Sequence, residues 1–212
     1  MIKIQAFEFN PFAEITYILS DSNHHCVIID PGCYQAQEKE ELAFYIRKNQ
    51  LKPQAIWLTH THLDHIFGVS FVKQLFNIPV VAHELAPDGI RMQPLVSKMY
   101  GIPCDECPKP DQLIKHGDQI YLGNFAFDVI HCPGHSSDGI VFYQPETGIA
   151  IAGDVLFAGS IGRTDLPGGD YETLISHIRN RLFILPSETK VYPGHGPSTS
   201  IGEEIHSNPF FQ

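Results

Sequence analysis

The chain has 212 residues, of which 43% are hydrophobic and 18% charged, so it has enough apolar material for a packed core and too little charge for a disordered chain. Its formal net charge of −10 argues against nucleic acid as a main partner, because phosphate binding needs a basic surface. The five cysteines form no regular framework, which is typical of reduced thiols. Without an apolar leader or a run of 18 apolar residues, the sequence predicts a cytoplasmic protein that does not enter a membrane.

Periodicity and turn signals predict alternating strands and helices along most of the chain. Apolar and β-branched runs predict strands at 2–9, 16–19, 26–29, 55–59, 80–82, 119–122, 125–131, 140–143, 149–152 and 190–192. Helices are predicted over 35–50, 64–76 and 171–185, whereas 84–117 holds several prolines and is the least regular part. The order of elements predicts one domain over 1–212, an α/β four-layer sandwich of the αββα type in which two sheets pack together with helices outside.

A cluster of histidines and one aspartate follows the predicted strand at 55–59. In an extended segment, His60 and His62 point to the same side, so both imidazoles can reach one metal ion. Asp64 and His65 follow as the chain turns into a helix and point elsewhere, toward a second ion.

Three further candidate ligands, His135, Asp154 and His195, stand at predicted strand ends beside glycine. Such positions present a side chain from a rigid scaffold into a cleft. Seven nitrogen and oxygen ligands without a thiolate suit two divalent ions such as zinc, with iron or manganese as alternatives.

The elements His-Thr-His-Leu-Asp-His, Pro-Gly-His-Ser, Gly-Asp and Pro-Gly-His-Gly, in this order over about 28–195, resemble the metallo-β-lactamase superfamily. The stretch 157–165 and the tail from 201 to 210 resemble its small, single-domain glyoxalase II-like branch, whose activity is hydroxyacylglutathione hydrolysis. The chain ends too soon after His195 for the C-terminal helical domain with which full-length glyoxalase II enzymes grip glutathione.

The resemblance implies a role for each candidate ligand. His60, His62 and His135 would bind a first metal, and Asp64, His65 and His195 a second. Asp154 would bridge the two ions.

The implied function is a binuclear metal-dependent hydrolase of thioesters such as S-lactoylglutathione, in which a metal-bridging hydroxide attacks the carbonyl. The expected partner is therefore a small-molecule acyl thioester. Asp64 is expected to orient the nucleophile as well as to bind metal. Arg163 is expected to bind a substrate carboxylate, and a salt bridge to Asp165 or Asp170 is the structural alternative.

Other functions remain open at this stage. A persulfide dioxygenase with a single iron shares the Gly-Arg-Thr-Asp element, and a metal-binding module without turnover would keep the same ligands. A β-lactamase is less expected, because a secreted enzyme would need a signal peptide. Cys104 and Cys107 are expected in a surface loop rather than in a redox pair or half a zinc site.

Overall fold

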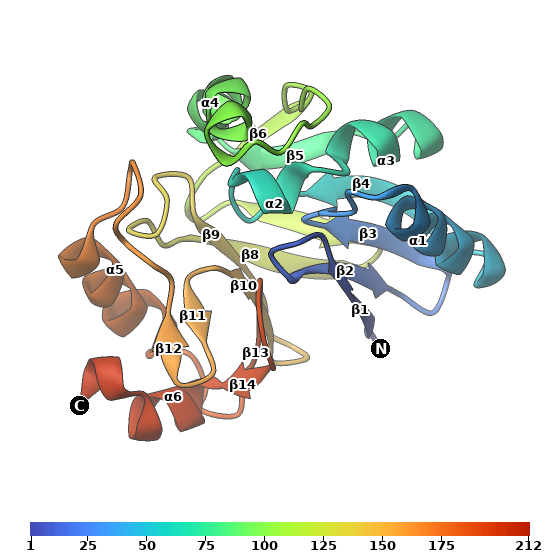
Figure 1. The fold of residues 1–212 in the computed structure, drawn as a ribbon. Helices are drawn as coiled ribbons and strands as arrows, with labels where there is room; N and C mark the ends of the chain where they lie inside the picture. Colours follow the sequence, from blue (N-terminus) through green and yellow to red (C-terminus); the bar gives the residue numbers. More distant parts are fainter.

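The computed structural model describes residues 1–212 and confirms the predicted four-layer sandwich (Figure 1). The first six-stranded sheet has the order β1-β2-β3-β4-β5-β6 and the second the order β14-β13-β10-β9-β8-β7. The strands of the first sheet are β1 (Lys3–Phe9), β2 (Glu14–Ser20), β3 (His25–Ile29), β4 (Lys52–Trp57), β5 (Val80–His83) and β6 (Gln112–Ile114). Those of the second are β7 (Gln119–Leu122), β8 (Phe125–His131), β9 (Ile140–Gln144), β10 (Ile149–Gly153), β13 (Lys190–Pro193) and β14 (Thr199–Ser200).

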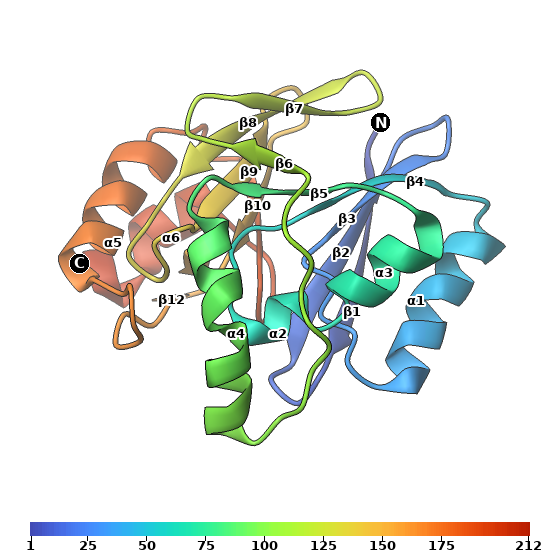
Figure 2. The same cartoon turned by 90° about the horizontal axis from the view of Figure 1, so that it is seen from above.

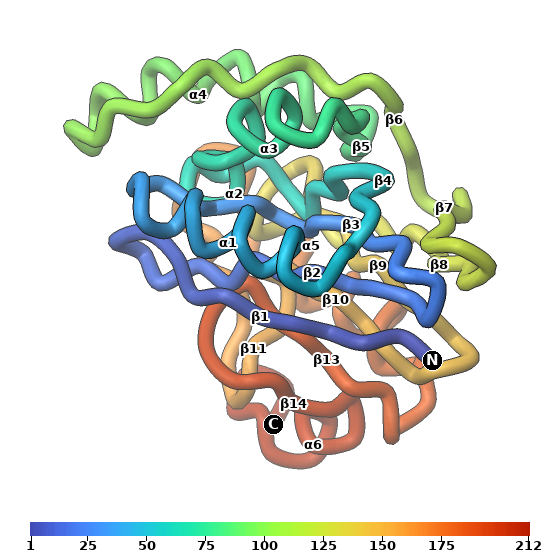
Figure 3. Tube along the Cα trace, turned by 90° about the vertical axis from the view of Figure 1, so that its right-hand side faces the viewer, coloured from blue at the N-terminus to red at the C-terminus, as the bar shows by residue number.

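Helices cover the outer face of each sheet, as the views from above and from the side show (Figures 2 and 3). On the first sheet they are α1 (Ala36–Lys48), α2 (Leu63–Ile66), α3 (Val69–Phe76) and α4 (Ala86–Tyr100). On the second they are α5 (Tyr171–His177), the π-helical turn η1 (Ile178–Leu182), α6 (Ile201–Ser207) and the 3₁₀ turn η2 (Pro209–Phe211). A small hairpin of β11 (Leu156–Phe157) and β12 (Ser160–Ile161) stands beside the second sheet. No helix combines the length and apolar character that crossing a bilayer requires.

Three apolar layers fill the spaces between the four structural layers. The alternation of side chains along β3 shows how: Cys26 and Ile28 point to the helices of the first sheet, while Val27 and Ile29 point to the second sheet. Because both faces of this strand are buried from Cys26 to Ile29, that part of its sequence is continuously apolar.

The structure corrects the expectation that 84–117 is irregular, because 86–100 forms the helix α4. Pro87 hides this helix in the sequence, but it stands in the first turn, where the missing backbone N–H costs nothing. Pro94 lies inside the helix, where proline is normally unfavourable.

Other helical segments differ from the prediction as well. The helix expected over 64–76 is interrupted between α2 and α3 at Gly68, where a Cβ would lie 2.4 Å from Cys33 Sγ. The short helix α6 near the C-terminus was not predicted.

Trp57 is the central side chain between the two sheets, and its replacement by alanine tests this core. It is buried, and its ring centroid lies 5.2 Å from that of Phe127 and 5.3 Å from that of Phe142. Trp57→Ala is expected to lower the free energy of unfolding by about 3–5 kcal/mol, because it leaves a cavity. Urea denaturation measures the change. Phe44→Ala, at an exposed position on α1, is the control and should change it by less than about 1 kcal/mol.

Candidate metal centre

Strand ends from both sheets converge at one edge of the sandwich. In the first sheet, β3 and β4 are parallel neighbours, so their carboxyl ends meet, and the chain after β4 carries His60 and His62 before entering α2. Asp64 and His65 belong to α2 itself. The second sheet contributes residues from the chain after β8, β10 and β13, namely His135, Asp154 and His195.

The structure brings all seven predicted ligands together. The metal-binding atoms of His60, His62 and His135 lie within 4.8 Å of one another, and so do those of Asp64, His65 and His195. A third group, Asp30, His60 and His65, meets the same criterion.

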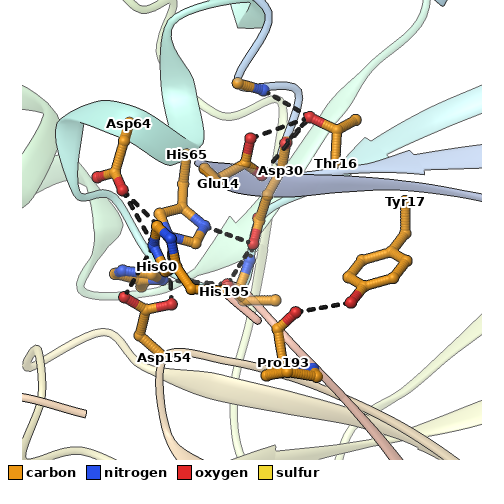
Figure 4. A network of polar contacts seen from close by, with 12 residues as sticks. Glu14, Thr16, Tyr17, Asp30, His60, Asp64, His65, Asp154, Pro193 and His195 are labelled. Atoms are coloured by element: carbon orange, nitrogen blue, oxygen red, sulfur yellow. Dashed lines mark hydrogen bonds and ion pairs between the residues drawn. The ribbon is translucent and has the colours of Figure 1, made fainter. Parts of the chain in front are cut away.

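Asp154 faces histidines of both predicted ligand groups, and Figure 4 shows its carboxylate beside His195. Its Oδ1 is 3.4 Å from His65 Nε2, and its Oδ2 is 3.5 Å from both His135 Nε2 and His195 Nε2. Asp64 Oδ2 is 3.2 Å from His195 Nε2 and 3.7 Å from His65 Nε2. One carboxylate therefore faces members of both groups, as a bridging ligand would.

Unpartnered polar atoms show that this centre fits metal ions. The buried atoms without a hydrogen-bond partner include His60 Nε2, His65 Nε2, His135 Nε2 and Asp154 Oδ1. Buried polar atoms are otherwise almost always paired, since an unpaired one costs about 1–3 kcal/mol. Their convergence on one point is the arrangement that a divalent cation completes.

The other ring nitrogen of four histidines is held by a hydrogen bond, which aims Nε2 at the centre. The Nδ1 partners are Thr59 Oγ1 for His60 (3.1 Å), Asp30 Oδ2 for His65 (3.0 Å), the Arg163 carbonyl for His135 (2.8 Å) and the Ala13 carbonyl for His195 (3.1 Å). Because the last two partners are backbone carbonyls, the course of the chain orients these rings.

Asp30 is a supporting residue that the sequence analysis did not identify. It follows β3 and is buried; its Oδ1 accepts the Thr59 N–H at 2.7 Å, and its Oδ2 accepts from Thr59 Oγ1 at 2.5 Å and from His65 Nδ1. The signal that could have revealed it is its position after an apolar strand, the same signal that marks the ligands.

Glu14 is a second supporting residue that the sequence analysis missed. Thr16 Oγ1 donates to the Asp30 carbonyl at 2.8 Å and accepts from the Gly32 N–H at 2.9 Å, so its one proton is used. The same hydroxyl lies 3.1 Å from Glu14 Oε2. Burial raises the pKa of Glu14 well above its ordinary value.

The first glycine of the Pro-Gly-His-Gly element, Gly194, stands where there is no room for a side chain. A Cβ at Gly194 would lie 2.2 Å from Asp154 Oδ1 and 2.6 Å from His65 Cε1. Any larger residue would displace the carboxylate between the two ligand groups.

The two ligand groups differ in their affinity for protons. Burial lowers the pKa of His60, lowers that of His62 to about 3 and lowers that of His135, so these imidazoles are neutral and ready to bind metal. Burial also acts to lower the pKa of His65 and His195, but the neighbouring carboxylates of Asp64 and Asp154 outweigh it and raise both. Protons therefore compete with a metal ion mainly in the second group.

A cavity of about 580 Å³ opens onto the centre and is lined by His62, Asp64, His135, Asp154 and His195 on the side of the ligands. Arg163 lines it too, but its Nε and Nη2 each donate to the Asp165 carboxylate at 2.8 Å. Of the two roles considered for Arg163, the salt bridge to Asp165 is present in the structure.

Two other groups of residues lie outside the centre. Cys104 and Cys107 stand in a loop, as expected, with free thiols, although Cys107 is buried. None of the remaining histidines belongs to a group that could hold a metal ion.

Fold and centre together define a metal-dependent enzyme scaffold, and comparison with known proteins identifies its class. The model of the metallo-beta-lactamase superfamily matches residues 12–195, so the chain belongs to this superfamily. A relative in Haemophilus influenzae, hydroxyacylglutathione hydrolase GloC, is 36% identical over 211 residues, which cover 99% of this chain and 98% of the relative. The predicted superfamily and fold are thereby confirmed.

Two solved structures are similar over nearly the whole chain. BLEG-1, described as a B3 metallo-beta-lactamase, superposes with a TM-score of 0.92 at 36% sequence identity. The superposition covers 99% of this chain and 100% of the BLEG-1 chain. TTHA1623, solved in a di-iron-bound form, has a TM-score of 0.86 at 36% identity and covers 97% of this chain and 99% of its own.

Asp30→Asn tests whether the hydrogen bonds behind the ligands support metal binding. Asparagine keeps the shape but places an NH₂ group among the Thr59 and His65 donors, so the His65 ring loses its acceptor. We expect metal affinity to fall by about 10–100-fold, measured by competition with a chromophoric chelator. Asp128→Asn, at a surface carboxylate that accepts from Gln119, is the matched control. Unchanged affinity in Asp30→Asn would show that Asp30 supports only the fold.

The raised pKa of His65 and His195 predicts stepwise metal loss on acidification. As pH falls through these values, protons occupy the second group, whereas the first group stays neutral because its pKa values are lowered. Metal content after dialysis should fall from two ions per chain to one before reaching zero, with the first step near or above the ordinary histidine pKa of about 6.5. In His195→Ala, the content should begin near one and lack that step. Simultaneous loss of both ions from the unmodified protein would contradict the prediction.

Proposed function

We propose that residues 1–212 form one hydrolase domain that binds two divalent metal ions and hydrolyses thioesters in the manner of glyoxalase II. His60, His62 and His135 would hold one ion, Asp64, His65 and His195 the other, and Asp154 both. The observation that carries the proposal is the convergence of buried, unpartnered Nε2 atoms and one carboxylate at the mouth of an open cavity.

Two bound divalent ions would supply a water of lowered pKa as the nucleophile and a Lewis acid for the substrate carbonyl. The chain itself supplies orientation and charge. Asp64, whose pKa is lowered by the surrounding histidines although burial opposes this, is ionised and can accept a hydrogen bond from a nucleophilic water beside it. Arg163, at the cavity wall, is proposed to meet a substrate carboxylate through Nη1, since Nε and Nη2 are bonded to Asp165.

The thioester assignment is supported by the GloC relative, which matches over the full length of both chains. Zinc is the proposed metal, and the di-iron-bound TTHA1623 structure keeps iron as the main alternative. The similarity to BLEG-1 favours β-lactam hydrolysis as a second candidate, because that reaction also adds water to a carbonyl and needs the same metal chemistry. The expected cytoplasmic location stays a prediction.

The proposal is tested by measuring metal content and turnover on the same sample. Metal-free protein is reloaded with zinc or iron and assayed with S-lactoylglutathione, a small acyl thioester and a β-lactam. We expect two ions per chain and thioester hydrolysis. His62→Ala and Asp154→Ala should each lower kcat/KM by at least about 100-fold, because each removes a ligand from the centre. His206→Ala, an exposed histidine on α6, is the matched control.

Each remaining outcome identifies a different function. One iron with oxygen consumption on a persulfide would identify the dioxygenase. Two ions with β-lactam turnover alone would identify a lactamase. Two ions without any turnover would leave a metal-binding module.

A further inference from the structure

One face of α4 forms an apolar wall of the cavity. Residues Met92, Leu95, Val96, Met99 and Tyr100 recur at helical spacing and all line the cavity. Four of them are large apolar side chains left open to solvent, with exposed fractions of 49% for Met92, 51% for Leu95, 76% for Met99 and 49% for Tyr100. A contiguous exposed apolar surface of this kind marks a binding site more often than a structural feature.

The opposite wall of the cavity is apolar as well. Phe157 and Ile161 of the β11–β12 hairpin line it, followed by Leu166 and Pro167. Phe12, between β1 and β2, closes one end: its ring meets that of Tyr100 edge to face at 5.9 Å. A flat or chain-like group lying between α4 and the hairpin would therefore contact carbon on both sides while one end reached the ligands.

Apart from the candidate metal ligands, the cavity lining carries little charge. Arg163 is the one Lys or Arg side chain among the lining residues, and Asp165 already neutralises it. The other formal charges of the lining are the carboxylates of Asp64 and Asp154 at the centre, and the whole chain carries −10. A thiol carrier with two carboxylates, such as glutathione, would find only Arg163 Nη1 as a cationic donor in this lining.

We infer that the preferred substrates are thioesters with an apolar acyl group, which lies against the apolar face of α4 while the thioester carbonyl faces the metal centre. This inference rests on the proposed thioester hydrolysis and names its substrate class. The reaction breaks the C–S bond, joins the water oxygen to the carbonyl carbon, and releases a carboxylic acid and a thiol that takes up the proton. It needs no oxidant, reductant or further co-reactant.

The test compares thioesters that share one uncharged thiol, N-acetylcysteamine, and differ only in the acyl group. With the zinc-loaded full chain, the hexanoyl thioester should exceed the acetyl thioester in kcat/KM by at least about tenfold. Complete burial of four added methylene groups would give about 200-fold, and the cavity is open on one side. Hexanoyl-N-acetylcysteamine should also exceed S-lactoylglutathione. A flat or reversed order would overturn the inference.

The substitutions Leu95→Ser and Met99→Ser test whether the preference for a long acyl chain depends on α4. Each should raise KM for the hexanoyl thioester about threefold to tenfold and raise KM for the acetyl thioester less, so that the hexanoyl-to-acetyl ratio of kcat/KM falls. Leu75→Ser, the same change at a partly exposed leucine of α3 outside the cavity, is the matched control and should alter neither. Equal effects on both thioesters would overturn the role of this face.

Two further measurements separate the ways of failing. Hydrolysis of the acetyl thioester without a chain-length preference would contradict only the inference about the acyl group. If no thioester is hydrolysed, the proposed function itself is wrong. In that second case, calorimetric binding of the non-hydrolysable S-hexyl-N-acetylcysteamine still decides the inference: tight binding weakened by Leu95→Ser supports it, and no binding overturns it. A dimer that Leu95→Ser converts to a monomer, seen by sedimentation, would assign the face to a second copy and overturn the inference.

Discussion

The hydrogen bonds of one buried carboxylate, Asp30, connect the fold to the metal centre. Its two oxygens accept from the Thr59 backbone, the Thr59 hydroxyl and the His65 ring, and so join the ends of the parallel strands β3 and β4. Asp30 has a left-handed backbone with φ of 46°, which costs a non-glycine residue about 1–2 kcal/mol. The bonds made by its side chain offset that cost. The orientation of the His65 ring therefore depends on the ends of β3 and β4. The candidate metal centre is held in place by the hydrogen-bonded sheet.

This arrangement makes the centre costly without metal. Four buried polar atoms lack hydrogen-bond partners. The carboxylates of Asp64 and Asp154 also lie close to His65 and His195 and raise the pKa of both imidazoles. The apolar layers on either side of each sheet offset the cost by burying large side chains such as Trp57 and Phe127. Since metal ions bind the folded state, their binding free energy adds directly to folding stability. The candidate ligands follow strands of both sheets. Metal binding would therefore stabilise the contact between the two sheets and not only one local segment.

The convergence of the seven candidate ligands could be predicted because each pairs a chemically specific side chain with a local signal. His135, Asp154 and His195 each stand beside glycine just beyond an apolar strand. The supporting residues were harder to predict: Asp30 also follows an apolar strand, but it stands in an Asp-Pro-Gly sequence that reads as a simple turn. Glu14 becomes informative only when the contacts around Thr16 are known. The helix α4 was missed for another reason. Its prolines at 87 and 94 suggest a loop, although the apolar residues between 92 and 100 recur at helical spacing.

The two faces of α4 have different environments: one packs into the core and the other lines the cavity. Ala86, Ile90 and Gln93 are its buried residues, and Gln93 accepts the Cys107 N–H at 2.9 Å and donates to the Asp105 carbonyl at 3.1 Å. The loop around Cys107 thus anchors the helix from behind, which gives that segment a structural role without a disulfide. The residues facing the cavity make little contribution to the core, because they remain largely exposed. The residues that pack into the core and those that line the cavity therefore lie on opposite faces of one helix, and the cavity wall can change without disturbing the strand ends that carry the candidate ligands.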